Sequence, residues 1–101
     1  MRHEYCVYIL ACSDGAYYTG ITNDMERRLE EHSEGSVREC FTYSRRPVLL
    51  KYVERFNDVE AAIRREKQLK GWSRAKKEAL MQNDPDRLRA LSGSYAATNS
   101  K

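Results

Sequence analysis

The chain has 101 residues, 33% of them charged and 41% apolar, which favours a single soluble globular domain and excludes a disordered chain. No apolar run approaches the roughly 20 residues of a membrane span, and no basic-then-apolar leader opens the sequence, so we expect a cytoplasmic protein without membrane contact. Residues 1–50 carry six Lys and Arg against eight Asp and Glu, whereas residues 51–91 carry eleven against seven. The basic second half suits a polyanionic partner, although a solvated helix face has the same composition.

The beginning of the chain predicts a β-hairpin followed by a helix. Residues 5–11 and 16–22 are rich in aromatic and β-branched residues, and the turn signal Ser13-Asp14-Gly15 separates them. Asn23 can cap a helix, and Glu26 three residues later completes a capping box. We therefore expect a hairpin and then a helix that starts at Asn23.

The middle of the chain predicts a loop, a strand and a second helix. Residues 36–46 show no clean period and are predicted to be a loop. Residues 48–53 (VLLKYV) form a short apolar run that is typical of a strand. Asp58 is the predicted N-cap of a helix that runs to about Lys70, where Gly71 ends it.

Two further helices and a tail complete the predicted elements. Ser73 is the expected N-cap of a third helix, and Asp84-Pro85 opens a short fourth helix that ends near Leu91. Residues 92–101 are small and polar and are predicted to be a disordered C-terminal tail. The order β-β-α-β-α-α-α indicates a domain of the α/β (α+β) class over residues 1–91.

The three cysteines, Cys6, Cys12 and Cys40, are odd in number and form no C-x-x-C pair. This pattern argues against a disulfide framework and is typical of a reducing compartment. A zinc site that combined the three thiols with His32 would have spacings that match no usual zinc pattern. Free buried or half-buried thiols are therefore the favoured interpretation.

The length of the hairpin loop decides whether Tyr8 and Tyr18 face the same side of the sheet. A two-residue loop, Asp14-Gly15, would place the tyrosines on opposite faces. A three-residue loop with Gly15 in the left-handed region pairs Tyr8 with Gly20. Both hydroxyls then share one face, with room for a ligand above the glycine. Taken alone, each tyrosine is more often a structural strand residue.

Arg28 and His32 lie four residues apart and therefore on one face of the first predicted helix. An arginine and a histidine that project together can hold a phosphate and move a proton. Several glutamates lie near them in the sequence, so a solvated ion-pair face is the alternative interpretation of this pair.

Glu66 is a charged residue within an otherwise apolar stripe of the second predicted helix. The predicted buried stripe comprises Val59, Ala62, Ile63 and Leu69. Glu66 lies three residues from both Ile63 and Leu69, and charged side chains are rarely buried without a partner. Glu66 is therefore either held by a salt bridge to an arginine or at the edge of the stripe, or it is a ligand for a hard cation such as Mg²⁺.

A basic run with one aromatic residue inside it follows Glu66. Exposed lysines at a helix start are commonly only solvated, and a tryptophan is commonly part of a core. Phosphate contact is the natural use of such a run if the partner is a nucleic acid. The run comprises Lys67, Lys70, Trp72, Arg74, Lys76 and Lys77.

The order and spacing of these segments resemble the GIY-YIG nuclease superfamily, in particular its small stand-alone bacterial members. The resemblance runs from Tyr5 to about Leu80. It is carried by V-Y-I-L at residues 7–10, Y-Y-T-G-I-T at 17–22, D-M-E-R-R-L-E-E-H at 24–32, R-R-P-V-L-L at 45–50 and A-A-I-R-R-E-K-Q-L-K-G-W-S-R at 61–74. The loop Ser36–Ser44 carries fewer lysines than this resemblance leads us to expect, which bears on DNA affinity more than on catalysis.

The resemblance implies a three-stranded antiparallel sheet flanked by helices, with the active site on the sheet face. Tyr8 stands where the family's first-motif tyrosine activates the attacking water, and Tyr18 where the second-motif tyrosine orients the site or assists that base. Arg28 matches the arginine that neutralises the phosphate and the departing oxygen, and His32 matches the position that closes the first helix motif. Glu66 matches the single carboxylate that holds one divalent metal ion, Mg²⁺ or Mn²⁺.

By this resemblance we expect a metal-dependent endonuclease that hydrolyses phosphodiester bonds in DNA. A chain of this size has no room for a separate target-recognition domain, so we expect a monomer directed to single-stranded or branched DNA rather than to a sequence. Lys70, Arg74 and Lys77 are predicted to contact phosphates without reading sequence. The alternative is a non-catalytic nucleic-acid-binding module on the same fold.

Overall fold

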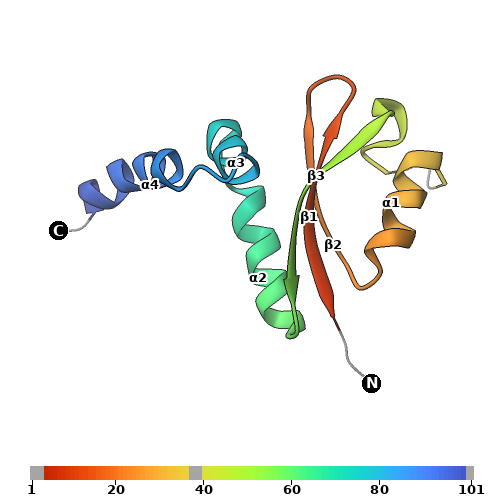
Figure 1. The fold of residues 1–101 in the computed structure, drawn as a ribbon, viewed down its shortest axis with the longest axis horizontal. Helices are drawn as coiled ribbons and strands as arrows, with labels where there is room; N and C mark the ends of the chain where they lie inside the picture. The colour runs from red at the N-terminus through yellow and green to blue at the C-terminus, as the bar shows by residue number, and fades with distance from the viewer. Residues whose placement is uncertain (1–3, 37–39, 100–101) are drawn as a thin grey trace. The chain divides into compact units, whose positions relative to one another are not determined.

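The computed structural model describes residues 4–36 and 40–99 (Figure 1). The strands are β1 (Tyr5–Cys12), β2 (Tyr17–Thr22) and β3 (Val48–Phe56). The helices are α1 (Met25–Glu34), the 3-10 helix η1 (Tyr43–Arg45), α2 (Val59–Lys70), α3 (Arg74–Met81) and α4 (Pro85–Asn99). The predicted order β-β-α-β-α-α-α and the α+β class are confirmed, and η1 is a single turn inside the predicted loop.

The chain forms two compact units, Met1–Lys70 and Gly71–Lys101. The first unit contains the sheet with α1 and α2, and the second contains α3 and α4, which pack against each other. Over the described part of the chain, no helix combines the length and the apolar character that crossing a membrane would require. The domain boundary placed at residue 91 stays a prediction.

The sheet of the first unit is antiparallel with the strand order β2-β1-β3, so β1 is its central strand. The residues of β1 from Val7 to Leu10 are at most 1% exposed. They are buried on both sides because α1 covers one face of the sheet and α2 the other (Figure 1). Met25 and Leu29 of α1 pack on the face that carries Tyr8 and Leu10.

The hairpin between β1 and β2 has the three-residue loop Ser13-Asp14-Gly15. Gly15 has a φ of 88°, in the left-handed region that a glycine adopts without steric cost. The resulting register pairs Tyr8 with Gly20 and places Tyr18 two residues away along the same face. Of the two loop lengths considered from the sequence, the three-residue loop is the one present, so the two tyrosines share one face of the sheet.

The start of α1 differs from its prediction by one residue. Asp24, and not Asn23, is the N-cap, because its carboxylate accepts a hydrogen bond from the Arg27 N–H at 3.1 Å. The Asp24 N–H in turn donates to Thr22 Oγ1 at 3.0 Å, which orients the chain into the helix. The placement of Asn23 as the cap is therefore wrong. A carboxylate interacts more favourably with the positive end of the helix dipole than an amide does.

The predicted caps of the later helices are confirmed. In each of these helices the cap side chain accepts a hydrogen bond from the N–H three residues later, which satisfies one donor of the first turn. The distances are 3.1 Å for Asp58, 3.2 Å for Ser73 and 3.1 Å for Asp84.

Two elements are longer than predicted. β3 continues past Val53 to Phe56. α4 continues past Leu91 to Asn99, so the predicted end of this helix is wrong. No proline follows Leu91, and the segment 95–97 (YAA) contains two alanines, the residue with the highest helix propensity.

The predicted buried stripe of α2 is only partly buried. Ala62 and Leu69 are 0% exposed, but Val59 and Ile63 are each 38% exposed. The prediction that all four residues are buried is therefore wrong. Val59 and Ile63 instead line an open groove together with residues of β2, α1 and the segment between them. Because β2 is an edge strand, the side of α2 that lies beside it has no further strand to cover it.

Candidate active site

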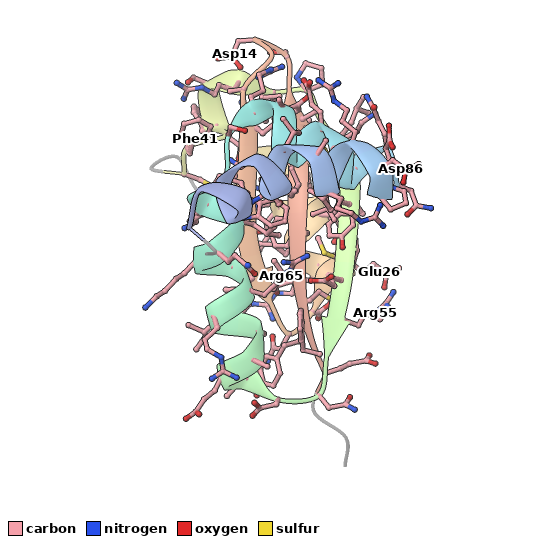
Figure 2. All side chains as sticks on the ribbon, turned by 90° about the vertical axis from the view of Figure 1, so that its left-hand side faces the viewer. Asp14, Glu26, Phe41, Arg55, Arg65 and Asp86 are labelled. Atoms are coloured by element: carbon pink, nitrogen blue, oxygen red, sulfur yellow. The ribbon has the colours of Figure 1, made fainter. Side chains whose placement is uncertain are left out.

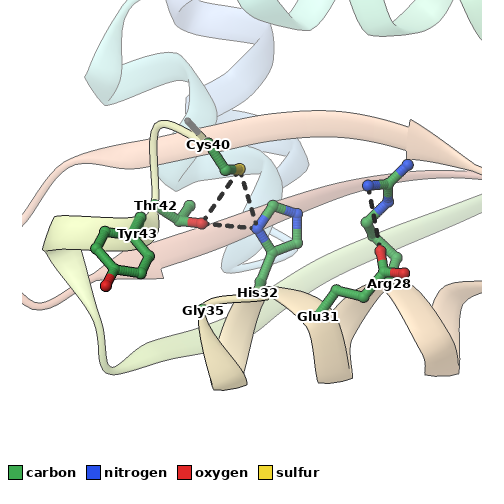
Figure 3. A pocket seen from close by; sticks show the side chains of 7 residues that line it. All are labelled: Arg28, Glu31, His32, Gly35, Cys40, Thr42 and Tyr43. Atoms are coloured by element: carbon green, nitrogen blue, oxygen red, sulfur yellow. Dashed lines mark hydrogen bonds and ion pairs between the residues drawn. The ribbon is translucent and has the colours of Figure 1, made fainter. Parts of the chain in front are cut away.

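Tyr8 and His32 form a hydrogen-bonded pair inside the first unit. The Tyr8 hydroxyl oxygen lies 3.0 Å from His32 Nε2, and the two residues are 1% and 4% exposed. The other ring nitrogen of the histidine, Nδ1, lies 2.7 Å from the hydroxyl oxygen of Thr42, which is 1% exposed (Figure 3). A chain of hydrogen bonds therefore joins the central strand, the last turn of α1 and the segment before β3.

These contacts allow two arrangements of the protons. If His32 Nδ1 donates to Thr42, Nε2 accepts from the Tyr8 hydroxyl; if Thr42 donates, Nε2 donates to the phenol oxygen. Burial, and then the charge of Arg28, lower the pKa of His32, so the imidazole is neutral at pH 7. In the first arrangement the neutral imidazole is a base placed to take the proton of Tyr8.

Tyr8 is held in its protonated form by its surroundings. Burial raises the pKa of Tyr8, the neighbouring Tyr18 adds to the increase, and the charge of Arg28 opposes it. A Cβ atom on Gly20 would lie 2.5 Å from the Tyr8 hydroxyl oxygen. The space above the glycine is therefore filled by Tyr8 itself, and the expectation of a ligand in that space is wrong.

Tyr18 lies at the centre of a group of rings. The centroid of its ring is 6.2 Å from that of Tyr8 and 5.1 Å from that of His32. The Tyr18 ring is also stacked on the ring of Phe41, with a distance of 5.9 Å between the centroids and an interplanar angle of 23°. Tyr18 is half-buried, so it is the more accessible of the two tyrosines.

Charges from both helices of the first unit act on Tyr18. Burial raises the pKa of Tyr18; the charges of Lys70 and Arg28 lower it, and that of Glu66 raises it. Arg28 belongs to α1, whereas Glu66 and Lys70 belong to α2. The edge strand β2 is therefore where the two helices on opposite faces of the sheet bring their charged residues together.

Arg28 is a partly exposed cation of α1 that lies near the ring cluster. Its Nη1 lies 3.3 Å from Glu31 Oε1, and its side chain is 41% exposed (Figure 3). The charge of Arg28 lowers the pKa of Tyr8, Tyr18 and His32, so it acts on all three titratable rings of the cluster formed by Tyr8, Tyr18, His32 and Phe41. An exposed ion pair contributes only about 0–1 kcal/mol, so Arg28 can turn from Glu31 to a phosphate at little cost.

Glu66 is paired with a lysine one turn later on α2. Its Oε2 lies 2.8 Å from Lys70 Nζ, and the side chains are 14% and 55% exposed. The hydrogen bond to Glu66 raises the pKa of Lys70. The sequence suggested a salt bridge from Glu66 to an arginine; the ion pair is present, but its partner is Lys70. The role of Glu66 as a metal ligand stays a prediction.

The donor set suits one hard divalent cation better than a metal held by several side chains. Within residues 4–36 and 40–99, no three or more His, Cys, Asp or Glu residues gather so that they could hold a metal ion. The three cysteines and His32 do not form such a group either. Mg²⁺ often takes only one or two carboxylates and keeps its water ligands. Glu66 is mostly buried and already faces a cation, so it fits that requirement.

The three predicted phosphate-contacting residues are divided between the two units. Lys70 ends α2 in the first unit, whereas Arg74 and Lys77 lie on α3 in the second. Arg74 forms an ion pair with Glu78 at 3.2 Å. Burial lowers the pKa of Lys77, and the charge of Arg74 lowers it further. Their common role in DNA binding stays a prediction.

The segment before β3 contributes two residues that the sequence did not single out, Thr42 and Phe41. Phe41 is stacked on Tyr18. The segment also brings the Sγ atom of Cys40, considered from the sequence only as a free thiol or zinc ligand, to 3.6 Å from His32 Nδ1 (Figure 3). The segment has no hydrophobic period, so the alternation F-T-Y over residues 41–43 is the one weak signal that could have indicated it.

The chain is similar to small proteins of bacteria and archaea. The family model described as the GIY-YIG catalytic domain matches residues 4–79. The UPF0213 protein of Syntrophus aciditrophicus is 44% identical over 82 residues, which cover 81% of this chain and 94% of that protein. A UPF0213 protein of Halobacterium salinarum is 49% identical over 74 residues, covering 73% and 95%. The solution NMR structure of a UPF0213 protein from Bacillus halodurans is 40% identical with a TM-score of 0.53, covering 80% and 85%.

Proposed function

The chain belongs to the GIY-YIG catalytic domain family, and we propose that it is an endonuclease that hydrolyses phosphodiester bonds in DNA with one divalent metal ion. The observation that carries the proposal is the buried pair of Tyr8 and His32, whose hydroxyl oxygen and Nε2 are 3.0 Å apart. Burial of an imidazole and a phenol is costly unless each is hydrogen-bonded, and packing alone needs neither. With Arg28 beside it, the pair has the parts that proton transfer at a phosphate requires.

In the proposed reaction, Tyr8 and His32 remove the proton of the attacking water. The neutral His32 takes the Tyr8 proton while Tyr8 takes the proton of the water, so no free phenolate has to persist in a buried site. Tyr8 is only 1% exposed, so neighbouring side chains must shift when DNA binds in order to admit the water. Thr42 keeps the imidazole ring oriented during this transfer.

In this proposal, Arg28 and Glu66 help to stabilise the negative charge of the phosphate. Arg28 binds the phosphate and neutralises the charge that grows on it in the transition state. Glu66 would hold the metal ion, and Mg²⁺ or Mn²⁺ supplies, when bound, further positive charge against that developing negative charge. Lys70, which now faces the Glu66 carboxylate at 2.8 Å, is then released toward the DNA backbone.

Incubation with end-labelled single-stranded, duplex and forked DNA, with and without Mg²⁺ or Mn²⁺, tests the proposal. We expect cleavage of single-stranded or forked DNA that depends on the metal ion. Tyr8→Phe is the matched control, because it keeps the ring and removes the hydroxyl. Cleavage that Tyr8→Phe leaves unchanged, or the absence of cleavage of every DNA by folded protein, would contradict the proposal.

A non-catalytic nucleic-acid-binding module is the second candidate function. The burial of Tyr8 favours it, and so does the occupation of the Glu66 carboxylate by Lys70. This alternative predicts that folded protein binds DNA with the salt dependence of phosphate contacts and never cleaves it, whichever divalent ion is added.

A further inference from the structure

The segment Phe41–Arg46 pairs each of its two aromatic rings with an arginine. Arg45 Cζ lies 3.9 Å from the centroid of the Phe41 ring, and Arg46 Cζ lies 4.6 Å from that of Tyr43. Phe41 is 43% exposed although it is a large apolar side chain. Exposed aromatic rings and arginine planes in one segment are the groups on which unpaired bases stack.

Phe41 stands at the outer end of the ring cluster of the candidate active site. Its ring is stacked on Tyr18 at 5.9 Å, and the Tyr18 ring lies 6.2 Å from that of Tyr8. The exposed fraction grows along this series from 1% at Tyr8 to 43% at Phe41. A base that stacks at the open end would therefore be separated from the buried hydroxyl of Tyr8 by the Tyr18 and Phe41 rings.

Arg45 is held in place next to Phe41 by two further contacts. Its Nε donates to Asp14 Oδ2 at 3.0 Å, and its Nη1 donates to the Phe41 carbonyl oxygen at 3.0 Å. Figure 2 shows Asp14 and Phe41 at the same end of the molecule. These contacts orient the guanidinium over the ring while 35% of the Arg45 side chain stays exposed. Its positive charge also attracts the backbone of a nucleic-acid strand.

We propose that the Arg45 guanidinium, held over the Phe41 ring, forms with that ring a stacking platform for one unpaired base of the DNA strand whose adjacent phosphate is bound at Arg28, the base lying on the outer side of the guanidinium. The inference rests on the proposed function, which identifies the bound strand as DNA. It makes single-stranded or frayed DNA the preferred substrate. A base inside a duplex is already stacked on both sides and offers no free face to the platform. Stacking tolerates any base, because every base has a π face.

Binding measured without divalent metal separates the platform from cleavage. The probes are fluorescently labelled single-stranded oligonucleotides with one abasic nucleotide at successive positions, and anisotropy is measured. Wild-type protein should bind about tenfold more weakly when one particular base is missing. Phe41→Leu keeps an apolar side chain without an aromatic face. It should bind the complete oligonucleotide about tenfold more weakly and respond equally to every abasic position.

Two further variants complete the experiment. Phe41→Trp should keep the affinity, because it keeps an aromatic face. The control Leu49→Ala changes another exposed apolar residue, 64% exposed on β3, which lies on the other side of β1 from β2. It should bind like the wild type. Phe41→Leu should also leave the slope of log affinity against log salt concentration unchanged, because no phosphate contact is lost.

The outcomes distinguish the platform from the nuclease proposal. Wild-type protein that binds all the abasic oligonucleotides equally would overturn the platform, and this result does not depend on whether any variant folds. Equal affinities of Phe41→Leu and wild type, with unchanged circular dichroism spectra, would overturn it as well. A third outcome is that the wild type loses affinity at one abasic position, Phe41→Leu does not, and the protein cleaves no DNA. This outcome would support the platform and overturn only the nuclease proposal.

Discussion

The two helices of the first unit bring opposite kinds of chemistry to the edge strand β2. On the α1 side, Tyr8, His32 and Thr42 are at most 4% exposed and are joined by hydrogen bonds of 3.0 and 2.7 Å. On the α2 side, Glu66 and Lys70 form one ion pair of 2.8 Å whose side chains are 14% and 55% exposed. The buried group has a fixed geometry before any substrate arrives, whereas the mostly buried Glu66 can exchange its exposed partner Lys70 for another cation. Proton transfer needs the first property, and charge neutralisation needs the second.

The largest effect is expected from Glu66→Gln, which tests whether the Glu66–Lys70 pair exchanges its lysine for a metal ion. Cleavage should fall by orders of magnitude, because the metal ion supplies several kcal/mol of transition-state stabilisation. The melting temperature should change little, because an i,i+4 ion pair with an exposed lysine contributes roughly 0.2–0.5 kcal/mol. A thermal melt and a cleavage assay on the same preparation check both expectations.

Glu60→Gln is the matched control, since Glu60 lies in the first turn of α2 and is exposed. It should alter neither the cleavage nor the melt. A large loss of stability in Glu66→Gln with cleavage per folded molecule preserved would make Glu66 a structural brace and end the one-metal mechanism.

The next largest effect is expected from Gly20→Ala, which tests whether the buried group of Tyr8, His32 and Thr42 is rigid. The added Cβ would lie 2.5 Å from the Tyr8 hydroxyl oxygen and 2.6 Å from its Cζ, so the ring or the strand must shift, which disturbs the contact of the hydroxyl with His32. Overpacking of this kind costs about 1–3 kcal/mol, which urea denaturation measures. Cleavage should fall together with stability. Gly71→Ala, at an exposed glycine, is the control, and equal stabilities of the two variants would show that the Tyr8 side is not rigid.

A smaller effect is expected from pH, because the pKa of His32 is lowered from its ordinary value of 6.5. As the pH falls below 6.5, the unfolded chain binds a proton at His32 that the folded chain does not bind. The free energy of unfolding therefore decreases as the pH falls, until the folded protein is protonated too. Cleavage should decrease in the same direction, because a protonated His32 cannot accept the Tyr8 proton.

Urea denaturation of the wild type and of His32→Gln at pH 7 and pH 5 isolates this contribution, since the variant has no titrating ring at that position. The wild type should lose more stability between the two pH values than the variant does. Equal losses would mean that His32 titrates alike in the folded and unfolded protein, and that its buried hydrogen bonds do not hold it neutral.

The smallest effect in any one condition is expected for the three predicted phosphate contacts, Lys70 at the end of α2 and Arg74 and Lys77 on α3. Replacing Lys70, Arg74 and Lys77 together with Ala should flatten the slope of log affinity against log salt concentration by roughly two to three units. Binding at low salt should weaken only moderately if other cations share the contacts. An unchanged salt slope in the triple variant would reject the placement of the DNA backbone at these residues.

The sequence by itself determined those features that depend on neighbours within a few residues. Gly15 can adopt a left-handed φ, so the sequence allowed the three-residue loop that pairs Tyr8 with Gly20, although it left a two-residue loop open as well. The caps at Asp58 and Ser73 followed from the sequence directly, because a cap acts on an N–H three residues later. The element order and the residues of the candidate site could be named from such local signals together with the resemblance.

Only the tertiary structure decided which of these residues are buried and what they touch. Val59 and Ile63 are exposed because the side of α2 that carries them lies beside an edge strand, a property of the sheet and not of the helix sequence. Thr42 and Phe41 reach His32 and Tyr18 across ten and twenty-three residues of chain, and no periodic pattern specifies such a contact. Local sequence sets backbone conformation through short-range sterics and hydrogen bonds, whereas burial and long-range pairing arise only when separate elements pack together.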